Sequence, residues 1–260
     1  MIYDISGKPA DEYLRFSENL TIQYLYDAES STAYYLTRIF KKKVDGTYQY
    51  PFIRNNGVNN RKSVYDLVTS EGWKIGINVS NGSGSMYIIE NGILVETRDT
   101  PLVSPIMTID NNGDMAFVEP EDVNYSAVPT GIISAAGGWW PIIENYEAVT
   151  EYDHNYADEP DFANQKAQRQ MFGQFGNGDY AIITSEGRSY DGSTGFTFDQ
   201  ARAVCIKHHI KNVMMLDGGG STQTVIGRKN INTVYEQTTG RPIRVALVFN
   251  GTNNYVIPTA

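Results

Sequence analysis

The sequence predicts an α+β fold, a single domain with a mixed, largely antiparallel twisted β-sheet and a few packed helices. Three observations predict it. Short β-prone runs flank Asn-Gly pairs, which tolerate the positive φ of tight hairpins. Two segments place apolar residues at helical spacing behind capping residues. A short apolar strand late in the chain leads directly into three consecutive glycines, an order typical of α/β and α+β enzymes.

The front half of the chain is rich in predicted strands. Leu20–Tyr26 and Ala33–Phe40 alternate or run apolar, which is typical of strands. Further along, β-prone runs surround Asn91-Gly92 and Asn112-Gly113. Each of these turns therefore predicts an antiparallel hairpin.

Two helices are predicted. Ser63–Ser70 carries its apolar residues on one face and ends at Gly72. Thr197–His209 opens with a capping box made by Thr197 and Gln200. Cys205 falls on the apolar face of this second helix, so we interpret it as a core residue rather than a nucleophile.

Composition excludes several functions. The 260 residues carry a net charge of −9, and no basic cluster is larger than Lys41–Lys43, so we expect no nucleic-acid partner. No apolar run approaches the ~20 residues of a membrane-spanning helix. One cysteine cannot form a disulfide within the chain.

The segment Leu216–Thr222 is the strongest chemical signal in the sequence. A run of three glycines, Gly218, Gly219 and Gly220, costs backbone entropy, and its amides are expected to form an anion-binding concavity. Asp217 precedes the glycines, and Ser221 and Thr222 follow them. Together they place a carboxylate, amide donors and two hydroxyls around one point, which suits acid–base or nucleophilic attack on an anionic substrate. A plain tight turn is the competing interpretation.

The order and spacing of several motifs resemble the phosphodiester glycosidase domain family, in its bacterial and phage form. The motifs are Arg169–Gly173, Gly178–Ile183, Glu186-Gly187-Arg188, Gly195–Thr197, Leu216–Ser221 and Arg241–Ile243. The resemblance extends over residues 20–250, which leaves residues 1–19 as an N-terminal extension and 251–260 as a tail. Two departures stand out. Val79-Ser80 replaces family glycines after Asn78, so that Asn81 is an alternative for the family asparagine, and Glu186 replaces an aspartate.

The resemblance implies hydrolysis of the bond between a sugar's anomeric carbon and a phosphate. Asp217 is then the nucleophile or the base for water, with Glu186 as the candidate second carboxylate. Arg169 and Arg241 are the candidates for neutralising the phosphate, assisted by the glycine amides. Substrate hydroxyls would be held by the remaining polar candidates, which are Asn78, Ser221 and Thr222.

Each candidate also has a structural interpretation. Arg169 is alternatively an ion-pair partner of Asp217, Arg241 a solvated strand end, Glu186 part of a solvated turn and Arg188 a surface residue. No cofactor is required by the sequence. Calcium is an open alternative at Asp217, Glu186 and the acidic stretch Asp153–Asp161.

The expected substrate is a glycosyl-phosphate polymer such as teichoic acid or a phosphorylated polysaccharide. No signal peptide is visible at Met1–Asp4, so a cytoplasmic location, a trimmed signal and delivery on a virion all stay open. The high Asn, Tyr and Gly content favours a virion or bacterial cell surface, where assembly into an oligomer or a virion is also open. The rival functions are a non-catalytic carbohydrate-binding virion module and a metal-assisted phosphodiesterase.

Overall fold

The computed structural model describes residues 12–17, 19–82, 86–98, 102, 104–137, 139–150, 162–234 and 239–249. It confirms the α+β class and a single domain with few helices. The strands form three sheets, and every described strand pairing is antiparallel. The expected parallel component of a mixed sheet is therefore not found among the described strands.

The largest sheet has eight strands in the order β1-β2-β3-β14-β13-β15-β11-β12. Their bounds are β1 Glu12–Ser17, β2 Leu20–Asp27, β3 Thr32–Ile39, β11 Pro141–Glu144, β12 Glu147–Ala148, β13 Gln170–Gln174, β14 Tyr180–Ser185 and β15 Asn212–Met215. β1 pairs with β2 although it lies within the segment expected to be an N-terminal extension. The sheet thus starts before residue 20.

A second, five-stranded sheet has the order β17-β16-β5-β18-β4. Its strands are β4 Pro51–Asn55, β5 Ile75–Ser80, β16 Thr224–Ile226, β17 Lys229–Asn230 and β18 Val245–Phe249. β18 lies between β5 and β4, so a strand from near residue 250 completes a sheet that begins near residue 50.

The third sheet has the order β7-β6-β10-β8-β9 and contains both predicted hairpins. Its strands are β6 Ile88–Glu90, β7 Ile93–Glu96, β8 Ile106–Asp110, β9 Met115–Val118 and β10 Ile132–Ala136. Asn91 (φ 48°) and Gly92 (φ 74°) both have positive φ in the β6–β7 turn, as an Asn-Gly hairpin turn requires.

Both predicted helices are present. α1 spans Val64–Glu71 behind the N-cap Ser63, and Gly72 ends it in the left-handed conformation. α2 spans Phe198–Lys207 and begins with the capping box predicted from Thr197 and Gln200. Three short 3-10 helices complete the list: η1 Pro120–Asp122, η2 Tyr190–Gly192 and η3 Gly219–Ser221. No helix among the described residues is long and apolar enough to cross a membrane.

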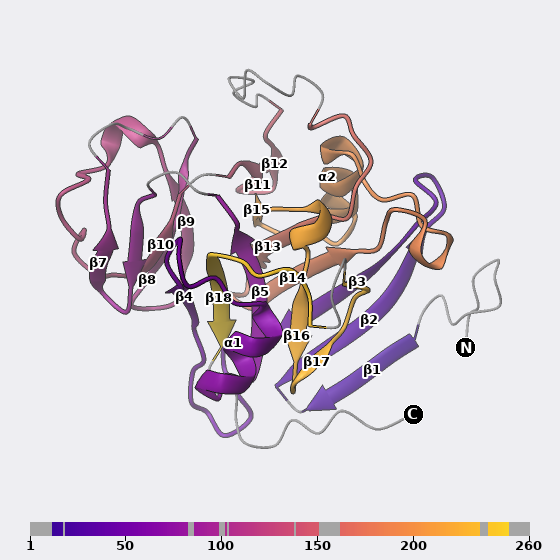
Figure 1. Ribbon diagram of the computed structural model, residues 1–260, viewed down its shortest axis with the longest axis horizontal. Helices are drawn as coiled ribbons and strands as arrows, with labels where there is room; N and C mark the ends of the chain where they lie inside the picture. Colours follow the sequence, from indigo (N-terminus) through magenta and orange to yellow (C-terminus); the bar gives the residue numbers. More distant parts are fainter. Residues whose placement is uncertain are drawn as a thin grey trace.

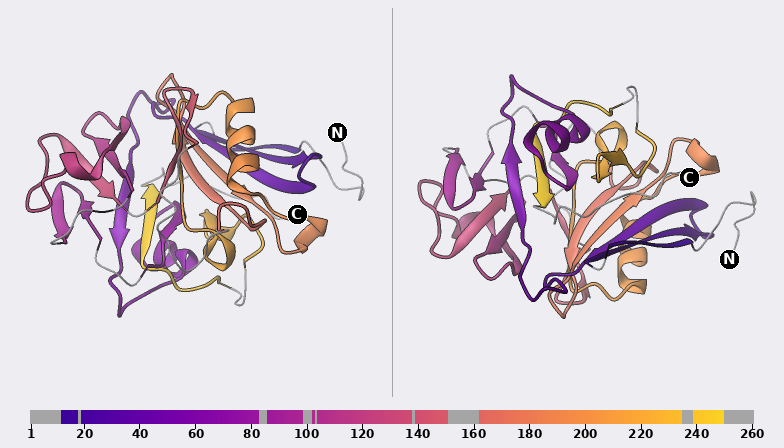
Figure 2. Two further views of the ribbon diagram at one scale, coloured as in Figure 1. Left: turned by 90° about the horizontal axis from the view of Figure 1, so that it is seen from above. Right: turned by 90° about the horizontal axis from the view of Figure 1, so that it is seen from below.

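The elements stack in layers, with α2 on one face of the eight-stranded sheet and α1 on the outer face of the five-stranded β17–β4 sheet (Figures 1 and 2). Successive residues of a strand serve different layers. In β14, Tyr180 and Ile182 face the core between the sheets, whereas Ala181 and Ile183 face α2. Cys205 lies in this second cluster, fully buried and 3.8 Å from the Met171 sulfur, and burial raises the pKa of its thiol, which confirms the predicted core role.

The contact between α1 and β5 depends on Gly76. A Cβ atom at this position would lie 2.6 Å from Val68 Cγ2 and 2.9 Å from Val64 Cγ1. These distances are far inside van der Waals contact, so any side chain here pushes the helix off the sheet.

We therefore expect Gly76→Ala to lower the free energy of unfolding by about 1–3 kcal/mol. Urea denaturation measures the loss. In a Val68→Ala background the same substitution should cost less, because the Cγ2 atom that it meets is gone. Equal costs in the two backgrounds would show that this contact does not limit the approach of α1.

Candidate active site

Asp217 lies where the eight-stranded sheet meets the β17–β4 sheet. It follows β15 at a distance of two residues, and its N–H donates to the Val79 carbonyl of β5 at 3.1 Å. Its own carbonyl accepts a hydrogen bond of 2.6 Å from the Asn78 amide Nδ2. Two main-chain contacts to neighbouring β5 residues therefore fix the backbone of Asp217 from the side opposite to its own strand.

The Asp217 carboxyl is largely buried and surrounded by donors. Asn81 N–H donates to its Oδ2 at 3.1 Å, and the Ser221 hydroxyl and the Gly218 N–H also hydrogen-bond to it. Burial nevertheless raises the pKa of Asp217, because desolvation of the charged form outweighs these hydrogen bonds and the positive charge of Arg241. A carboxyl with a raised pKa exchanges a proton nearer to neutral pH than an exposed one does.

The glycines of the turn Gly218–Gly220 allow close approach of neighbouring groups, but most of their amides are not available to a ligand. The Gly219 N–H donates to the Gln168 carbonyl at 2.8 Å, and the Gly218 N–H bonds to the Asp217 carboxyl. The expected anion-binding concavity thus loses two of its three amides to protein groups. A Cβ on Gly218 would lie 2.7 Å from the Gln168 carbonyl oxygen, so glycine is required there by close approach of the backbone.

Arg241 lies close enough to Asp217 for its charge to lower the pKa of that carboxyl. Its main-chain carbonyl accepts a hydrogen bond of 2.7 Å from Gln223 Nε2, which ties the approach to β18 to the end of the glycine turn. The side chain is partly exposed. A guanidinium that is accessible and near the carboxylate fits the role predicted for an arginine that binds phosphate.

Arg169 has a different environment from the one expected of a phosphate ligand. It is 1% exposed, and its guanidinium donates to the carbonyls of Phe162, Gln165 and Phe196 at 2.6–2.9 Å. The rings of Phe162 and Phe198 lie 4.9 and 4.7 Å from its Cζ. Burial lowers the pKa of Arg169 to about 10, partly offset by Asp217, so it stays charged at neutral pH. Arg169 therefore packs against the glycine turn, with its Cδ 3.5 Å from the position of a Cβ on Gly218, and its guanidinium is bonded to main-chain carbonyls.

Glu186 also differs from its expected role. It is 1% exposed, not part of a solvated turn, and its Oε1 accepts a hydrogen bond of 2.9 Å from the Thr233 N–H. Its own N–H donates to the Ala33 carbonyl of β3 at 2.9 Å. The carboxylate thus anchors the segment around Thr233, and it is not among the groups that shift the pKa of Asp217.

Asn78 and Thr222 lie in the interior, beside the glycine turn. Both side chains are fully buried. The Asn78 amide is engaged by main-chain groups, since Oδ1 accepts from the Gln223 N–H at 2.8 Å while Nδ2 holds Asp217. Thr222 donates its N–H to Gly219, and its carbonyl accepts from Asn232. Ser221, by contrast, does reach the Asp217 carboxyl.

Two functional neighbours were not assigned as such from the sequence. Asn81, considered only as a substitute for Asn78, touches the Asp217 carboxyl through its main chain. Arg188 is exposed, as expected of a surface residue, yet its guanidinium lies over the glycine turn, with Nη2 3.1 Å from the position of a Cβ on Gly219. The motif Glu186-Gly187-Arg188 held this signal, because it resembles the family motif although Glu186 replaces the family aspartate.

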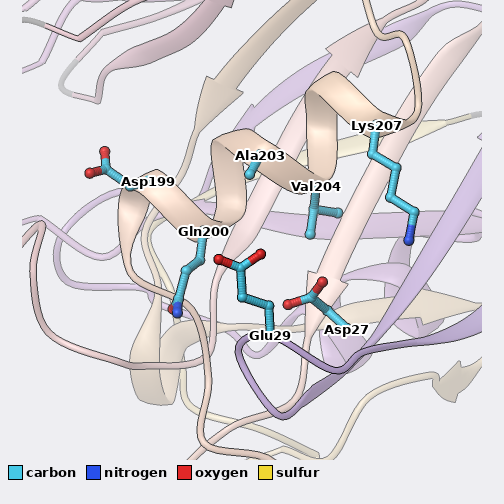
Figure 3. A pocket seen from close by; sticks show the side chains of 7 residues that line it. All are labelled: Asp27, Glu29, Asp199, Gln200, Ala203, Val204 and Lys207. Atoms are coloured by element: carbon cyan, nitrogen blue, oxygen red, sulfur yellow. The ribbon is translucent and has the colours of Figure 1, made fainter.

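Within the described ranges, no three His, Cys, Asp or Glu residues are grouped as a metal site requires, and Asp153–Asp161 lies outside those ranges. A pocket of about 260 Å³ lies elsewhere, between α2 and the β2–β3 turn. Figure 3 shows Glu29 in this pocket, pointing toward α2. None of the residues that line it belongs to the Asp217 site.

A family model described as phosphodiester glycosidase matches residues 54–250 of this chain. The chain belongs to the phosphodiester glycosidase family. The match includes every residue of the Asp217 site.

Similar proteins include a prophage-derived relative and solved structures with the same fold. The chain is 26% identical over 237 residues to the SPbeta prophage-derived uncharacterized protein YomE of Bacillus subtilis (strain 168), covering 83% of this chain and 36% of that protein. It thus spans about a third of its relative. The fold is also that of the catalytic domain of zebrafish N-acetylglucosamine-1-phosphodiester alpha-N-acetylglucosaminidase, auto-inhibited by its pro-peptide (TM-score 0.67, 16% identity, 95% and 90% of the two chains). A hypothetical protein from Synechocystis has a TM-score of 0.63 at 12% identity, over 93% and 64% of the chains.

The raised pKa of Asp217 has a consequence for stability. Folded protein holds the Asp217 proton at pH values where the unfolded chain has already lost it, so ionisation of this group costs stability as pH rises through that window. Asp217→Asn should therefore raise the free energy of unfolding by about 1 kcal/mol at pH 8, a size common for stabilising changes at functional sites.

Urea denaturation at pH 8 and pH 4 measures this effect, and the gain should shrink at the lower pH. Asp122→Asn is the matched control, because Asp122 is exposed and the substitution removes the same charge. A variant of Asp217 that is less stable than the parent protein at pH 8 would contradict the assignment of a desolvated carboxyl.

Proposed function

We propose that this protein hydrolyses the bond between the anomeric carbon of a sugar and a phosphodiester, with Asp217 as the catalytic carboxylate. The observation that carries the proposal is the burial of one carboxyl, Asp217, among hydrogen-bond donors on a glycine turn that two accessible arginines approach. Carboxylate and guanidinium are the two groups that this reaction needs, one for the sugar and one for the leaving phosphate.

The reaction breaks the bond from the anomeric carbon to the bridging oxygen, and that oxygen leaves with the phosphate. Asp217, ionised, either attacks the carbon and forms a glycosyl ester that water then hydrolyses, or takes a proton from the water that attacks the carbon directly. The net products are a free sugar hydroxyl and a phosphate monoester. The Ser221, Asn81 and Gly218 donors orient the carboxylate and leave its position unchanged as positive charge develops on the sugar ring.

The leaving phosphate is a weak base, so its departure depends more on neutralising charge than on a strong general acid. Arg241, predicted from the sequence as a phosphate ligand, is partly exposed. Arg169 serves instead to hold the turn, and Glu186 to hold the segment at Thr233. A single carboxylate beside arginines therefore replaces the two-carboxylate arrangement of the sequence-based hypothesis.

We further propose a bacterial surface polymer, such as a teichoic acid with glycosyl-phosphate links, as the substrate, and a phage setting. The prophage origin of the Bacillus subtilis relative supports the phage setting. The net charge of −9 opposes binding to a long polyanion over a wide surface, so the chain is expected to engage one phosphodiester at a time.

Release of sugar from a methyl diester of N-acetylglucosamine 1-phosphate and from purified teichoic acid tests the proposal. Asp217→Asn should lower kcat by at least about 10³-fold, since the variant can neither attack nor accept a proton. Because Asp217→Asn is expected to be at least as stable as the parent protein, a loss of activity would not reflect unfolding. Unchanged sugar release by Asp217→Asn, or no release by the parent protein from either substrate, would overturn the assignment.

Hydrolysis in ¹⁸O-labelled water separates this reaction from phosphodiesterase chemistry. The label should enter the sugar, because water attacks carbon. Label in the phosphate would show cleavage of the P–O bond and would favour the rival enzyme.

The pH profile of kcat/KM should fall on the acid side with an apparent pKa above the ordinary aspartate value, because burial raises the pKa of Asp217. Arg241→Gln removes the charge that lowers this pKa, so the acid limb should move to higher pH. Rates measured between pH 4 and pH 9 give the acid limb of the parent protein and that of the Arg241→Gln variant. An acid limb that moves to lower pH, or stays fixed, would show that Arg241 does not act on the catalytic carboxyl.

A further inference from the structure

We propose that Arg188 binds the phosphate of the substrate and makes the site selective for sugars joined to phosphate over sugars joined to an uncharged group. This inference rests on the proposed function and adds a specificity-determining residue to it. The sequence alone indicated only a surface arginine at this position.

The position of the side chain is the first argument. Arg188 is exposed, and its Nη2 and Cζ lie 3.1 and 4.0 Å from where a Cβ on Gly219 would be. The guanidinium therefore covers the turn that carries Asp217, and the absence of a side chain on Gly219 (φ 56°) makes that approach possible. Gly219 is therefore needed to make space for Arg188. Its amide has no part in this, because it is already bonded to the Gln168 carbonyl.

The backbone under Arg188 is the second argument. Arg188 (φ 55°) and Ser189 (φ 66°) are consecutive left-handed residues with side chains, a conformation that costs free energy and persists only where the surroundings impose it. Ser189 N–H bonds to the Ser193 carbonyl at 2.9 Å and Tyr190 N–H to the Gly187 carbonyl at 3.0 Å. The turn is thus closed by its own main-chain hydrogen bonds, which fix the backbone position from which Arg188 extends.

Gln168 couples this turn to the glycine turn. Its carbonyl accepts the Gly219 N–H at 2.8 Å, and its main-chain nitrogen lies 2.8 Å from the position of a Cβ on Gly187. Both turns are therefore packed on one fully buried residue. The main chains that carry the arginine and the carboxyl are therefore positioned through one residue before any substrate arrives, which favours electrostatic stabilisation with little reorganisation.

The arginines then divide the work. Arg169 is enclosed by carbonyls and aromatic rings, whereas Arg241 lies beside Asp217 and Arg188 is exposed over the turn, so these two arginines share the phosphate. A diester carries one negative charge, and the monoester that leaves gains a second as the bond to carbon breaks. A guanidinium at the phosphate is therefore stronger for the transition state than for the bound substrate, and its loss lowers kcat as well as raising KM.

The experiment compares Arg188→Gln and Arg188→Lys with Arg228→Gln. Arg228 is also exposed and left-handed (φ 68°), on the β16–β17 turn, so its variant loses the same charge from the same backbone conformation. Substrates are the methyl diester of N-acetylglucosamine 1-phosphate and p-nitrophenyl N-acetyl-α-glucosaminide. A second, turnover-free readout is the binding of inorganic phosphate, followed by ³¹P line broadening.

Arg188→Gln should lower kcat/KM for the diester about 10- to 100-fold, as expected for a lost charge-assisted hydrogen bond, and change it less than about 3-fold for the uncharged glycoside. Arg188→Lys should retain part of the activity, because its point charge lacks the bidentate geometry. Phosphate binding should weaken in Arg188→Gln and stay unchanged in Arg228→Gln.

Equal losses on both substrates, an unchanged diester rate, or an equal loss in Arg228→Gln would each overturn the role of Arg188. Failure of the proposed function is a separate result, namely no hydrolysis of either substrate by the parent protein. In that case the phosphate measurement still decides, since undiminished phosphate binding by Arg188→Gln would refute the inference by itself.

Discussion

The site depends on one side-chain amide, that of Asn78. It accepts a hydrogen bond from the main chain at Gln223 and donates one to the carbonyl of Asp217, so it joins the segments before and after the glycine turn to β5. Gln223 extends the connection, since its own side chain bonds to the first N–H of α1 and to the carbonyl of Arg241. Two neutral amides thus set the distance between a carboxylate and a guanidinium that come from different sheets. Buried amides suit this task because they satisfy main-chain groups without adding charge.

Local parts of the fold could be predicted from the sequence because local chemistry determines them. Asn91-Gly92 selects a tight hairpin turn, and Thr197 with Gln200 selects the start of α2. The assembly of three sheets could not be predicted in this way. β3 pairs with β14, and β15 with β11, across long stretches of chain, and apolar periodicity says nothing about which strand becomes a neighbour. The same limit explains why β1 was assigned to an extension rather than to the sheet.

For the site, the sequence located the chemistry but not the direction of each side chain. Asp217, Ser221 and Arg241 do converge, and the glycines do lie beside them. Arg169, Glu186 and Asn78 also belong to segments that resemble the family, yet all three side chains are buried. A motif shows that a particular residue type occurs at a position. It does not show whether that residue is a buried structural anchor or a substrate ligand. Only burial and hydrogen-bond partners distinguish the two, and these depend on strands that are remote in sequence.

The central position of β18 has a consequence for how this protein folds during its synthesis. β18 follows every other described strand in the chain, yet it lies between β4 and β5. During synthesis, which delivers the N-terminal part first, the edges of β4 and β5 stay open until residues 245–249 leave the ribosome. Open strand edges invite pairing with other chains, so this interval is when a nascent molecule is most prone to aggregate. Arg241 arrives just ahead of the same strand, which means that the Asp217 site is assembled in the last step, together with the sheet that supports it.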